Sequence, residues 1–125
     1  MKIILSALMA VLLSAMPAAA YTAQNGLIVQ AEGADTFFVP WRGKAGAADF
    51  WCAAGDYAVQ ALRLPVTTMV FRVSEPPRRS GDGVRFTLRA DQAATSSGLA
   101  LHWPGGPGLT AGSAQSLCEN RKKRR

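Results

Sequence analysis

Two cysteines constrain the fold of this chain more than any other feature. Cys52 and Cys118 are the only cysteines among its 125 residues, and about half the length of the chain separates them. An even number of cysteines in an exported chain is typical of a disulfide framework. In the chain-entropy treatment, a crosslink that closes a loop of this size stabilises the folded state by about 4 kcal/mol. We therefore expect one disulfide between Cys52 and Cys118.

The alternative is that Cys52 is a catalytic nucleophile. It would need a base, and His102 is the only histidine in the chain. In papain-like enzymes an aromatic residue follows the nucleophilic cysteine, whereas Trp51 precedes Cys52 here. The local signature of that class is absent, so the disulfide is favoured over a Cys–His pair.

The first twenty residues predict export. Lys2 supplies a positive charge, residues 3–16 form an uncharged apolar run, and Pro17 is followed by three alanines. This is the pattern of a secretory signal peptide cleaved after Ala20. The apolar run is shorter than the ~20 residues that a bilayer span needs. We expect a signal peptide over residues 1–20 and a periplasmic or secreted mature protein with no transmembrane anchor.

The excess positive charge lies in a short C-terminal tail. Removing Lys2 and the last five residues from the 14 Lys and Arg leaves eight, which equal the 8 Asp and Glu. Residues 21–120 are expected to form one neutral domain, and residues 121–125 a disordered, solvated tail. Binding of the tail to a polyanion such as lipid head groups is the alternative, and nucleic acid is not an expected partner. The tail residues are Arg121, Lys122, Lys123, Arg124 and Arg125.

Hydrophobic periodicity predicts a small α+β domain. Strict alternation of side chains over three segments is typical of antiparallel strands with one face on the core. Two shorter strands flank a polar turn, and a single long helical pattern ends before Pro65. The order β-β-α-β-β-β-α predicts a small antiparallel sheet packed on one main helix. We expect strands over residues 27–31, 36–40, 66–74, 83–90 and 98–103, and helices over residues 47–62 and 110–120, the latter capped by Thr110.

The predicted main helix has two contrasting faces. Trp51, Cys52 and Gly55 fall on the stripe that we expect to pack against the sheet, and Asp49 and Asp56 fall on the polar stripe that we expect to face solvent. A glycine inside a helix costs about 1 kcal/mol relative to alanine. Its place on the buried stripe indicates a close approach to a strand.

The same helix carries a resemblance. The string WCAAGDYA at residues 51–58, followed by a strand and by SEPPRRSGDGVRFTL at residues 74–88, resembles a group of small exported bacterial proteins that share this helix and a second, C-terminal cysteine. The resemblance covers about residues 26–118. It implies export and a disulfide, and it implies no activity, because none is known for the group.

Alternation in the last three predicted strands places four basic side chains on one exposed face of the sheet. Guanidinium groups suit carboxylates and phosphates. We therefore consider an anion-binding face for a small anionic ligand or an acidic partner protein. An ordinary solvated face is the alternative, because arginine is common on exposed strands. The residues of this predicted face are Arg72, Arg85, Arg89 and His102.

Enzyme and metal signatures are missing from the sequence. The chain has one histidine and eight dispersed acids, so we expect no metal and no cofactor. Neither a G-x-S-x-G nucleophile elbow nor a glycine-rich phosphate loop is present.

The three tryptophans offer a second kind of recognition surface, as in carbohydrate-binding modules. Trp51 and Trp103 fall on predicted core faces, and Trp41 at a strand end is expected to be exposed. The favoured function is a non-enzymatic, exported binding or interaction domain. The alternatives are a small thiol- or His102-dependent hydrolase, or an envelope-associated structural protein tethered by its basic tail.

Overall fold

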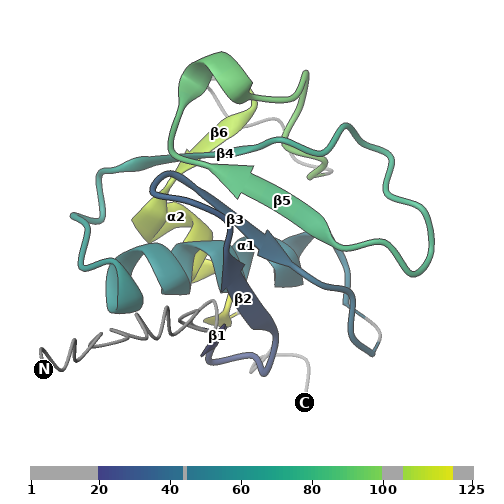
Figure 1. Ribbon diagram of the computed structural model, residues 1–125, viewed down its shortest axis with the longest axis horizontal. Helices are drawn as coiled ribbons and strands as arrows, with labels where there is room; N and C mark the ends of the chain where they lie inside the picture. Colours follow the sequence, from purple (N-terminus) through teal and green to yellow (C-terminus); the bar gives the residue numbers. More distant parts are fainter. Residues whose placement is uncertain (1–19, 44, 100–105, 120–125) are drawn as a thin grey trace, which may run out of the picture.

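A computed structural model describes residues 20–43, 45–99 and 106–119 of the chain. Within these residues the fold is α+β, as predicted, and six antiparallel strands form one sheet in the order β1-β2-β3-β5-β4-β6 (Figure 1). The strands are β1 (Ala20–Thr22), β2 (Ile28–Ala31), β3 (Thr36–Val39), β4 (Met69–Arg72), β5 (Val84–Thr87) and β6 (Gly108–Thr110).

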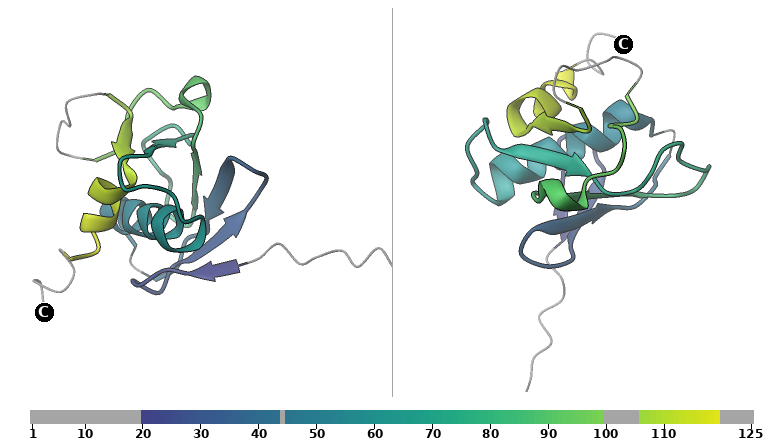
Figure 2. Two further views of the ribbon diagram at one scale, coloured as in Figure 1. Left: turned by 90° about the vertical axis from the view of Figure 1, so that its left-hand side faces the viewer. Right: turned by 90° about the horizontal axis from the view of Figure 1, so that it is seen from above.

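The main helix lies on the inner face of the sheet, and the short last helix lies beside it (Figure 2). α1 (Ala47–Asp56) continues directly into a π-helical segment, η1 (Tyr57–Ala61). α2 (Ala111–Ser116) follows β6, and the Thr110 side chain caps it by accepting a hydrogen bond from Ser113 N at 3.2 Å, as predicted. A single 3-10 turn, η2 (Ala90–Gln92), follows β5.

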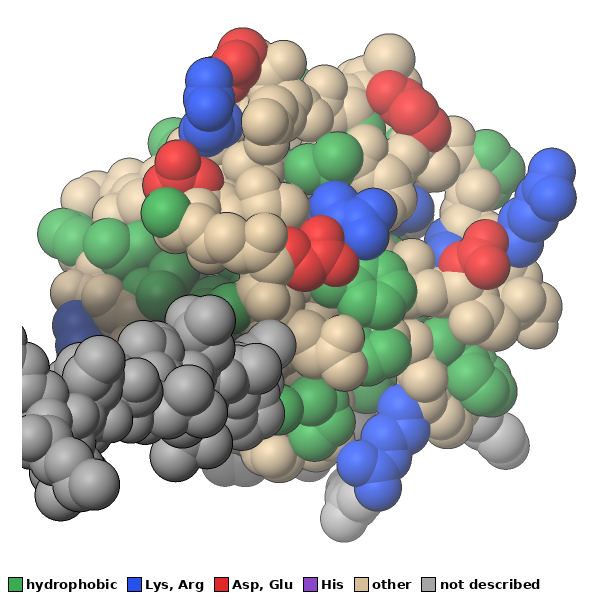
Figure 3. All heavy atoms as spheres, in the orientation of Figure 1, with side chains coloured by type: hydrophobic (Ala, Val, Ile, Leu, Met, Phe, Trp, Pro, Cys, Tyr) green, Lys and Arg blue, Asp and Glu red, His purple; other side chains and the backbone are tan. Residues whose placement is uncertain are grey.

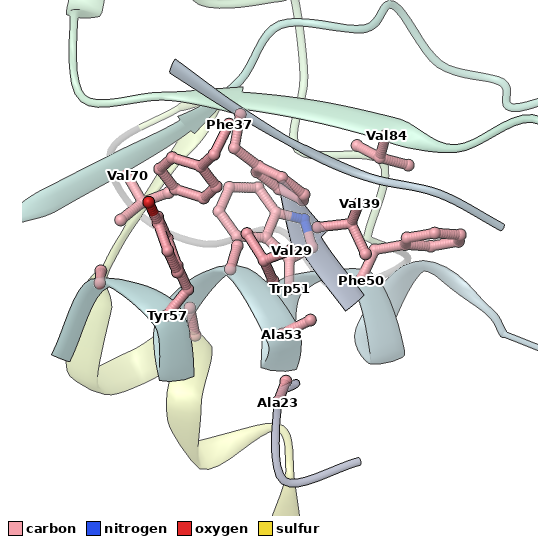
Figure 4. Close-up of a cluster of buried hydrophobic side chains, with 14 of the residues drawn as sticks. Ala23, Val29, Phe37, Val39, Phe50, Trp51, Ala53, Tyr57, Val70 and Val84 are labelled. Carbon is pink, nitrogen blue, oxygen red and sulfur yellow. The ribbon is translucent and has the colours of Figure 1, made fainter. Parts of the chain in front are cut away.

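Aromatic rings fill the space between the sheet and α1 (Figure 4). The Trp51 ring packs edge-on against Phe86 with centroids 4.9 Å apart, and Phe37 contacts Tyr57 at 4.8 Å. The buried Trp51 indole also donates a hydrogen bond to Ser97 O at 2.9 Å. This bond satisfies the polar atom of a side chain that is otherwise surrounded by the core.

The predicted disulfide is confirmed. Cys52 on α1 and Cys118, which follows α2, are joined with their Cα atoms 4.8 Å apart. Gly55, three residues after Cys52, marks where the two helices touch. A Cβ atom at Gly55 would lie 2.7 Å from Ala114 Cβ and 2.8 Å from Ala111 O. The close approach is therefore to α2, and the expected approach to a strand was wrong.

Asp56 is buried, although the helical pattern placed it on the solvent face. Only 3% of the residue is exposed, because α2 and the β1–β2 connection cover that side of α1. Its carboxylate accepts hydrogen bonds from Tyr21 Oη at 2.9 Å, Gln24 N at 3.0 Å, and the side-chain amide of Gln115 at 3.2 Å. A buried carboxylate needs such donors, and here they tie both ends of the domain to α1.

Two strands differ from the sequence prediction. β1 and β6 have three residues each, too short to show alternation, and they are strands because β2 and β4 pair with them. The strand predicted over residues 98–103 is not formed at Gly98 and Leu99, and the rest of it lies outside the described residues. The sixth strand comes later, at residues 108–110.

Candidate functional site

The predicted face of four basic side chains is not formed. Arg72 pairs with Phe86 in the β4–β5 register, so both side chains are on the inner face of the sheet, whereas Arg85 pairs with Phe38 on the outer face. Arg72 is only 3% exposed. The apolar Met69 and Phe71 predict that their face of β4 packs on the core and that Arg72 is exposed, and the register with β5 shows the two faces to be the other way round.

Arg85 and Arg89 each have an acidic partner. Arg85 donates two hydrogen bonds to Glu32, at 2.6 and 3.0 Å, and lies 5.2 Å from the centre of the Phe38 ring. The hydrogen bond between them lowers the pKa of Glu32 and raises the pKa of Arg85. Arg89 pairs with Asp91 at 3.0 Å. With their charges balanced locally, these arginines are poor candidates for capturing an anion.

Several predicted residues lie outside the described part of the chain: His102, Trp103 and the tail Arg121, Lys122, Lys123, Arg124 and Arg125. Of the other tryptophans, Trp51 is buried and Trp41 is 44% exposed, as predicted.

Neither cysteine is free in the structure, so Cys52 is not available as a nucleophile while the disulfide is intact. The described residues contain no cluster of three or more acidic, histidine or cysteine side chains able to hold a metal ion. They also contain no helix with the length and apolar character needed to cross a bilayer.

A cleft of about 450 Å³ opens where the β1–β2 turn faces the loop between β3 and α1. Most of the residues on its two walls are small or polar, and Leu27 is the exception among those described. Its lining residues are Thr22, Asn25, Gly26, Leu27, Arg42, Gly43 and Ala45.

The β1–β2 turn forms the first wall. Gly26 has φ +86°, a conformation that favours glycine, and its N–H donates to Ala23 O at 2.9 Å. Asn25 fixes the turn to α1, because its side-chain amide donates to Asp49 O at 2.8 Å while its oxygen accepts from Leu27 N at 3.2 Å. The wall is therefore held in place by the helix behind it.

The loop before α1 forms the second wall. Gly43 has φ +62° and, like Arg42 and Gly26, is exposed. No atom of the described residues lies within 4 Å of a Cβ atom built on Gly26 or Gly43, so the backbone at both glycines is accessible to a ligand from this part of the structure. The loop leads to Gly46, the N-cap of α1, whose N–H donates to the Asp49 carboxylate at 2.9 Å.

Arg42 is the one ionisable side chain among the described residues that line the cleft. Elsewhere, Figure 3 shows acidic and basic side chains dispersed over the visible described surface rather than gathered in a patch of one sign. The start of α1 adds the partial positive charge of a helix N-terminus, which Asp49 partly offsets. The cleft therefore has a local positive bias on a surface of mixed charge.

Sequence reasoning did not identify the cleft. The adjacent Asn25 and Gly26 are a turn signal, and the stretch RGKAGA at residues 42–47 has the composition of a loop. Neither pattern shows that the two loops face each other, because that arrangement depends on β2 and β3 placing both beside the start of α1.

No protein-family model matches this chain, and no match is found among curated proteins or solved structures. The resemblance to small exported proteins with the WCAAGDYA string therefore stays a prediction. Any function has to be inferred from the geometry of the described residues.

Proposed function

We propose that this protein is an exported, disulfide-stapled binding domain that holds a small anionic ligand in the cleft beside Arg42. The observation that carries the proposal is a cleft with one arginine and no acid among its described lining residues. An anion would meet a charge that no described acid on the cleft wall neutralises. This distinguishes Arg42 from Arg85 and Arg89, which have acidic partners.

The composition of the cleft suggests the ligand class. Its volume of about 450 Å³ falls within the range of roughly 300–1,000 Å³ typical of small-molecule sites. A guanidinium group binds carboxylates and phosphates through two parallel N–H donors. Thr22 and Asn25 add polar atoms, and Leu27 and Ala45 add apolar ones. A small carboxylate or phosphate ester with a compact, partly apolar body fits this lining.

A binding role rather than catalysis is favoured by the cysteine chemistry. The disulfide occupies both sulfur atoms, and no cysteine or histidine lines the cleft among its described residues. A thiol-dependent hydrolase would need Cys52 reduced. The disulfide is also compatible with an oxidising compartment outside the cytoplasm, which supports export without establishing it.

The proposal can be tested by expressing the full chain with its own N-terminal segment. The mature protein is purified from the periplasm or medium, and intact mass is used to determine its first residue. Small carboxylates and phosphate esters are then titrated while amide resonances are followed by NMR. We expect saturable shifts centred on Gly26 and Gly43, and a first residue of Tyr21.

Two variants make the test specific. Arg42→Gln removes the cleft cation and is expected to weaken binding at least tenfold. Arg89→Gln removes a surface cation elsewhere and should leave binding unchanged. Shifts that persist in Arg42→Gln, or that no tested anion produces in the unaltered protein, would count against the proposed function.

A further inference from the structure

Arg72 is a buried cation at the end of β4. Only 3% of Arg72 is exposed, and its side chain is on the inner face of the sheet beside Phe86. The Nε atom donates to Ser74 O at 2.7 Å. The Nη2 atom is fully buried and has no hydrogen-bond partner among the described residues. An unsatisfied buried donor is rare in folded proteins, and more costly when it is charged.

The loop after η2 packs closely against Arg72 at two of its residues. Ala94 N donates to Arg72 O at 2.6 Å, which anchors the start of the loop to β4. Gly98 packs directly against the side chain, because a Cβ atom there would lie 3.1 Å from Arg72 Cζ and closer still to Nη1. With φ +75°, Gly98 also has a backbone conformation that favours glycine. The loop thus leaves room for the arginine and no more on that side.

No carboxylate among the described residues pairs with Arg72. The nearby Glu75 is engaged elsewhere, because it accepts hydrogen bonds from Thr95 N at 3.1 Å and Thr95 Oγ1 at 2.7 Å. Burial and the positive charge of Arg78 lower the pKa of Arg72, while Glu75 opposes this. Within the described part of the chain, a buried arginine thus lacks the hydrogen-bonded carboxylate that burial ordinarily requires.

We propose that Arg72 holds a small oxyanion, a carboxylate or a phosphate, through its Nη2 group in an enclosed site between β4 and the loop of residues 93–99. This second site is separate from the cleft at Arg42. Binding would supply both a hydrogen-bond acceptor for Nη2 and a paired negative charge, neither of which the described residues provide. Because Arg72 is buried, the loop has to move away from it for an anion to bind, so exchange between free and bound protein should be slow on the NMR timescale.

Trp51 provides a built-in reporter of this loop. Its indole N–H donates to Ser97 O, next to Gly98. A bound anion that orders the loop should shift the Trp51 indole N–H resonance. The variants Trp41→Phe and Trp103→Phe identify which indole signal belongs to Trp51.

The test uses the full, oxidised protein carrying Arg42→Gln, so that binding at the cleft is weakened. Sodium phosphate or sodium acetate replaces sodium chloride at constant ionic strength, while the melting temperature and the Trp51 indole signal are measured. We expect the melting temperature to rise with the logarithm of the oxyanion concentration above its Kd, by about 10 °C at a hundredfold excess, while the shift of the Trp51 indole signal saturates. A response to phosphate alone assigns a phosphate ligand, and a response to acetate alone assigns a carboxylate.

Two further variants are made in the Arg42→Gln protein. Arg72→Met should abolish the response to the oxyanion. Arg89→Met, which also removes one positive charge, is the control and should retain the response. In chloride, Arg72→Met should melt no lower than the Arg89→Met control, because it removes an unpaired buried cation. If Arg72→Met does not fold, Arg72→Lys serves instead, with about tenfold weaker binding expected from the loss of the fork. A melting temperature that ignores the oxyanion while Arg72 is intact would overturn the proposal, as would an unchanged response in Arg72→Met.

Discussion

α1 is held from several directions at Gly55 and Asp56, whereas its N-terminal end starts at an exposed glycine. Toward the C-terminal end of α1, α2 contacts Gly55 and hydrogen bonds from Tyr21 and Gln24 reach Asp56, and the disulfide leaves from Cys52 one turn earlier. At the start, Gly46 has no side chain to cap the helix, and Arg42 and Gly43 face solvent.

The difference shows how a domain this small can combine a rigid frame with an open surface. Stability is concentrated where distant segments meet on α1, so the neighbouring loops need not pack tightly. Such an arrangement suits a binding site, because a rigid element behind the loops holds their exposed side chains and backbone atoms in position for a ligand. On this division, changes in the C-terminal half of α1 should affect folding, and changes in the loop before its start should affect binding alone.

The largest expected effect comes from the disulfide. Replacing Cys52→Ala and Cys118→Ala together removes a crosslink between residues 66 positions apart. The free energy of unfolding should fall by about 4 kcal/mol, because the unfolded chain regains its loop entropy. Denaturant unfolding of the double variant measures this, with the reduced native protein as a control. A loss below 1 kcal/mol would mean that other contacts hold α2 in place.

Asp56→Ala should cost about 3 kcal/mol. The substitution leaves the Tyr21 hydroxyl, the Gln24 N–H and the Gln115 amide without their acceptor, and each unpaired donor carries a desolvation penalty. Asp56→Asn, which keeps one oxygen acceptor, should lie between this variant and the unaltered protein. Equal stability of all three would show that the contacts of Asp56 at the C-terminal end of α1 do not stabilise the fold.

Gly55→Ala separates packing from helix propensity. Propensity alone predicts a gain of about 1 kcal/mol. Because the added Cβ atom would lie 2.7 Å from Ala114 Cβ, we expect overpacking and a net loss of about 2 kcal/mol. Gly112→Ala is a matched control on α2, where the nearest atom, Val66 Cβ, is 3.0 Å away, and its loss should be smaller. A stabilised Gly55→Ala protein would contradict the close helix contact.

Alkaline pH offers a further test of the same contacts. Burial and the hydrogen bond to Asp56 raise the pKa of Tyr21 to about 12. An unfolded chain releases this proton near pH 10, so the folded state binds it more tightly. The stabilisation is complete below about pH 10 and is lost as the pH rises toward 12. The free energy of unfolding, measured as a function of pH, should show this loss. In Tyr21→Phe, which has no hydroxyl at this position, the free energy of unfolding should fall less between pH 10 and 12 than in the unaltered protein.

The smallest effect on folding is expected at the cleft. Arg42→Gln should change the free energy of unfolding by less than about 0.5 kcal/mol, because Arg42 is an exposed loop residue. Thermal unfolding beside the unaltered protein measures the difference. A loss as large as that of Gly55→Ala would show that Arg42 packs against the domain and contributes to folding.

The inner face of β5 was predictable, and that of β4 was not. Val84 and Phe86 are buried, as their alternation predicts. In β4 the same logic chose Met69 and Phe71 for the core, yet Val70 and Arg72 lie there. Alternation divides the side chains of a strand between two faces, and the more apolar face is expected to be the buried one. In β4 the buried face is the one that carries an arginine, so this expectation fails. The register with β5 decides the matter, and that register is a long-range property.

The candidate site was less predictable than the fold. The disulfide followed from a count of two cysteines, and the main helix from its periodicity. The cleft at Arg42 and the burial of Arg72 both depend on loops that strand pairing brings together. The burial of Asp56 depends on hydrogen-bond partners as far away in sequence as Gln115. No local pattern of residue types carries such information.

The crosslink between α1 and the end of α2 has a further consequence. With two cysteines in the whole chain, a monomer has a single possible oxidised isomer. Scrambled pairings, which trap many disulfide-rich domains, do not exist for it. Any oxidant can therefore close the bond correctly, before or after collapse, and the protein needs no isomerase to reach its native connectivity.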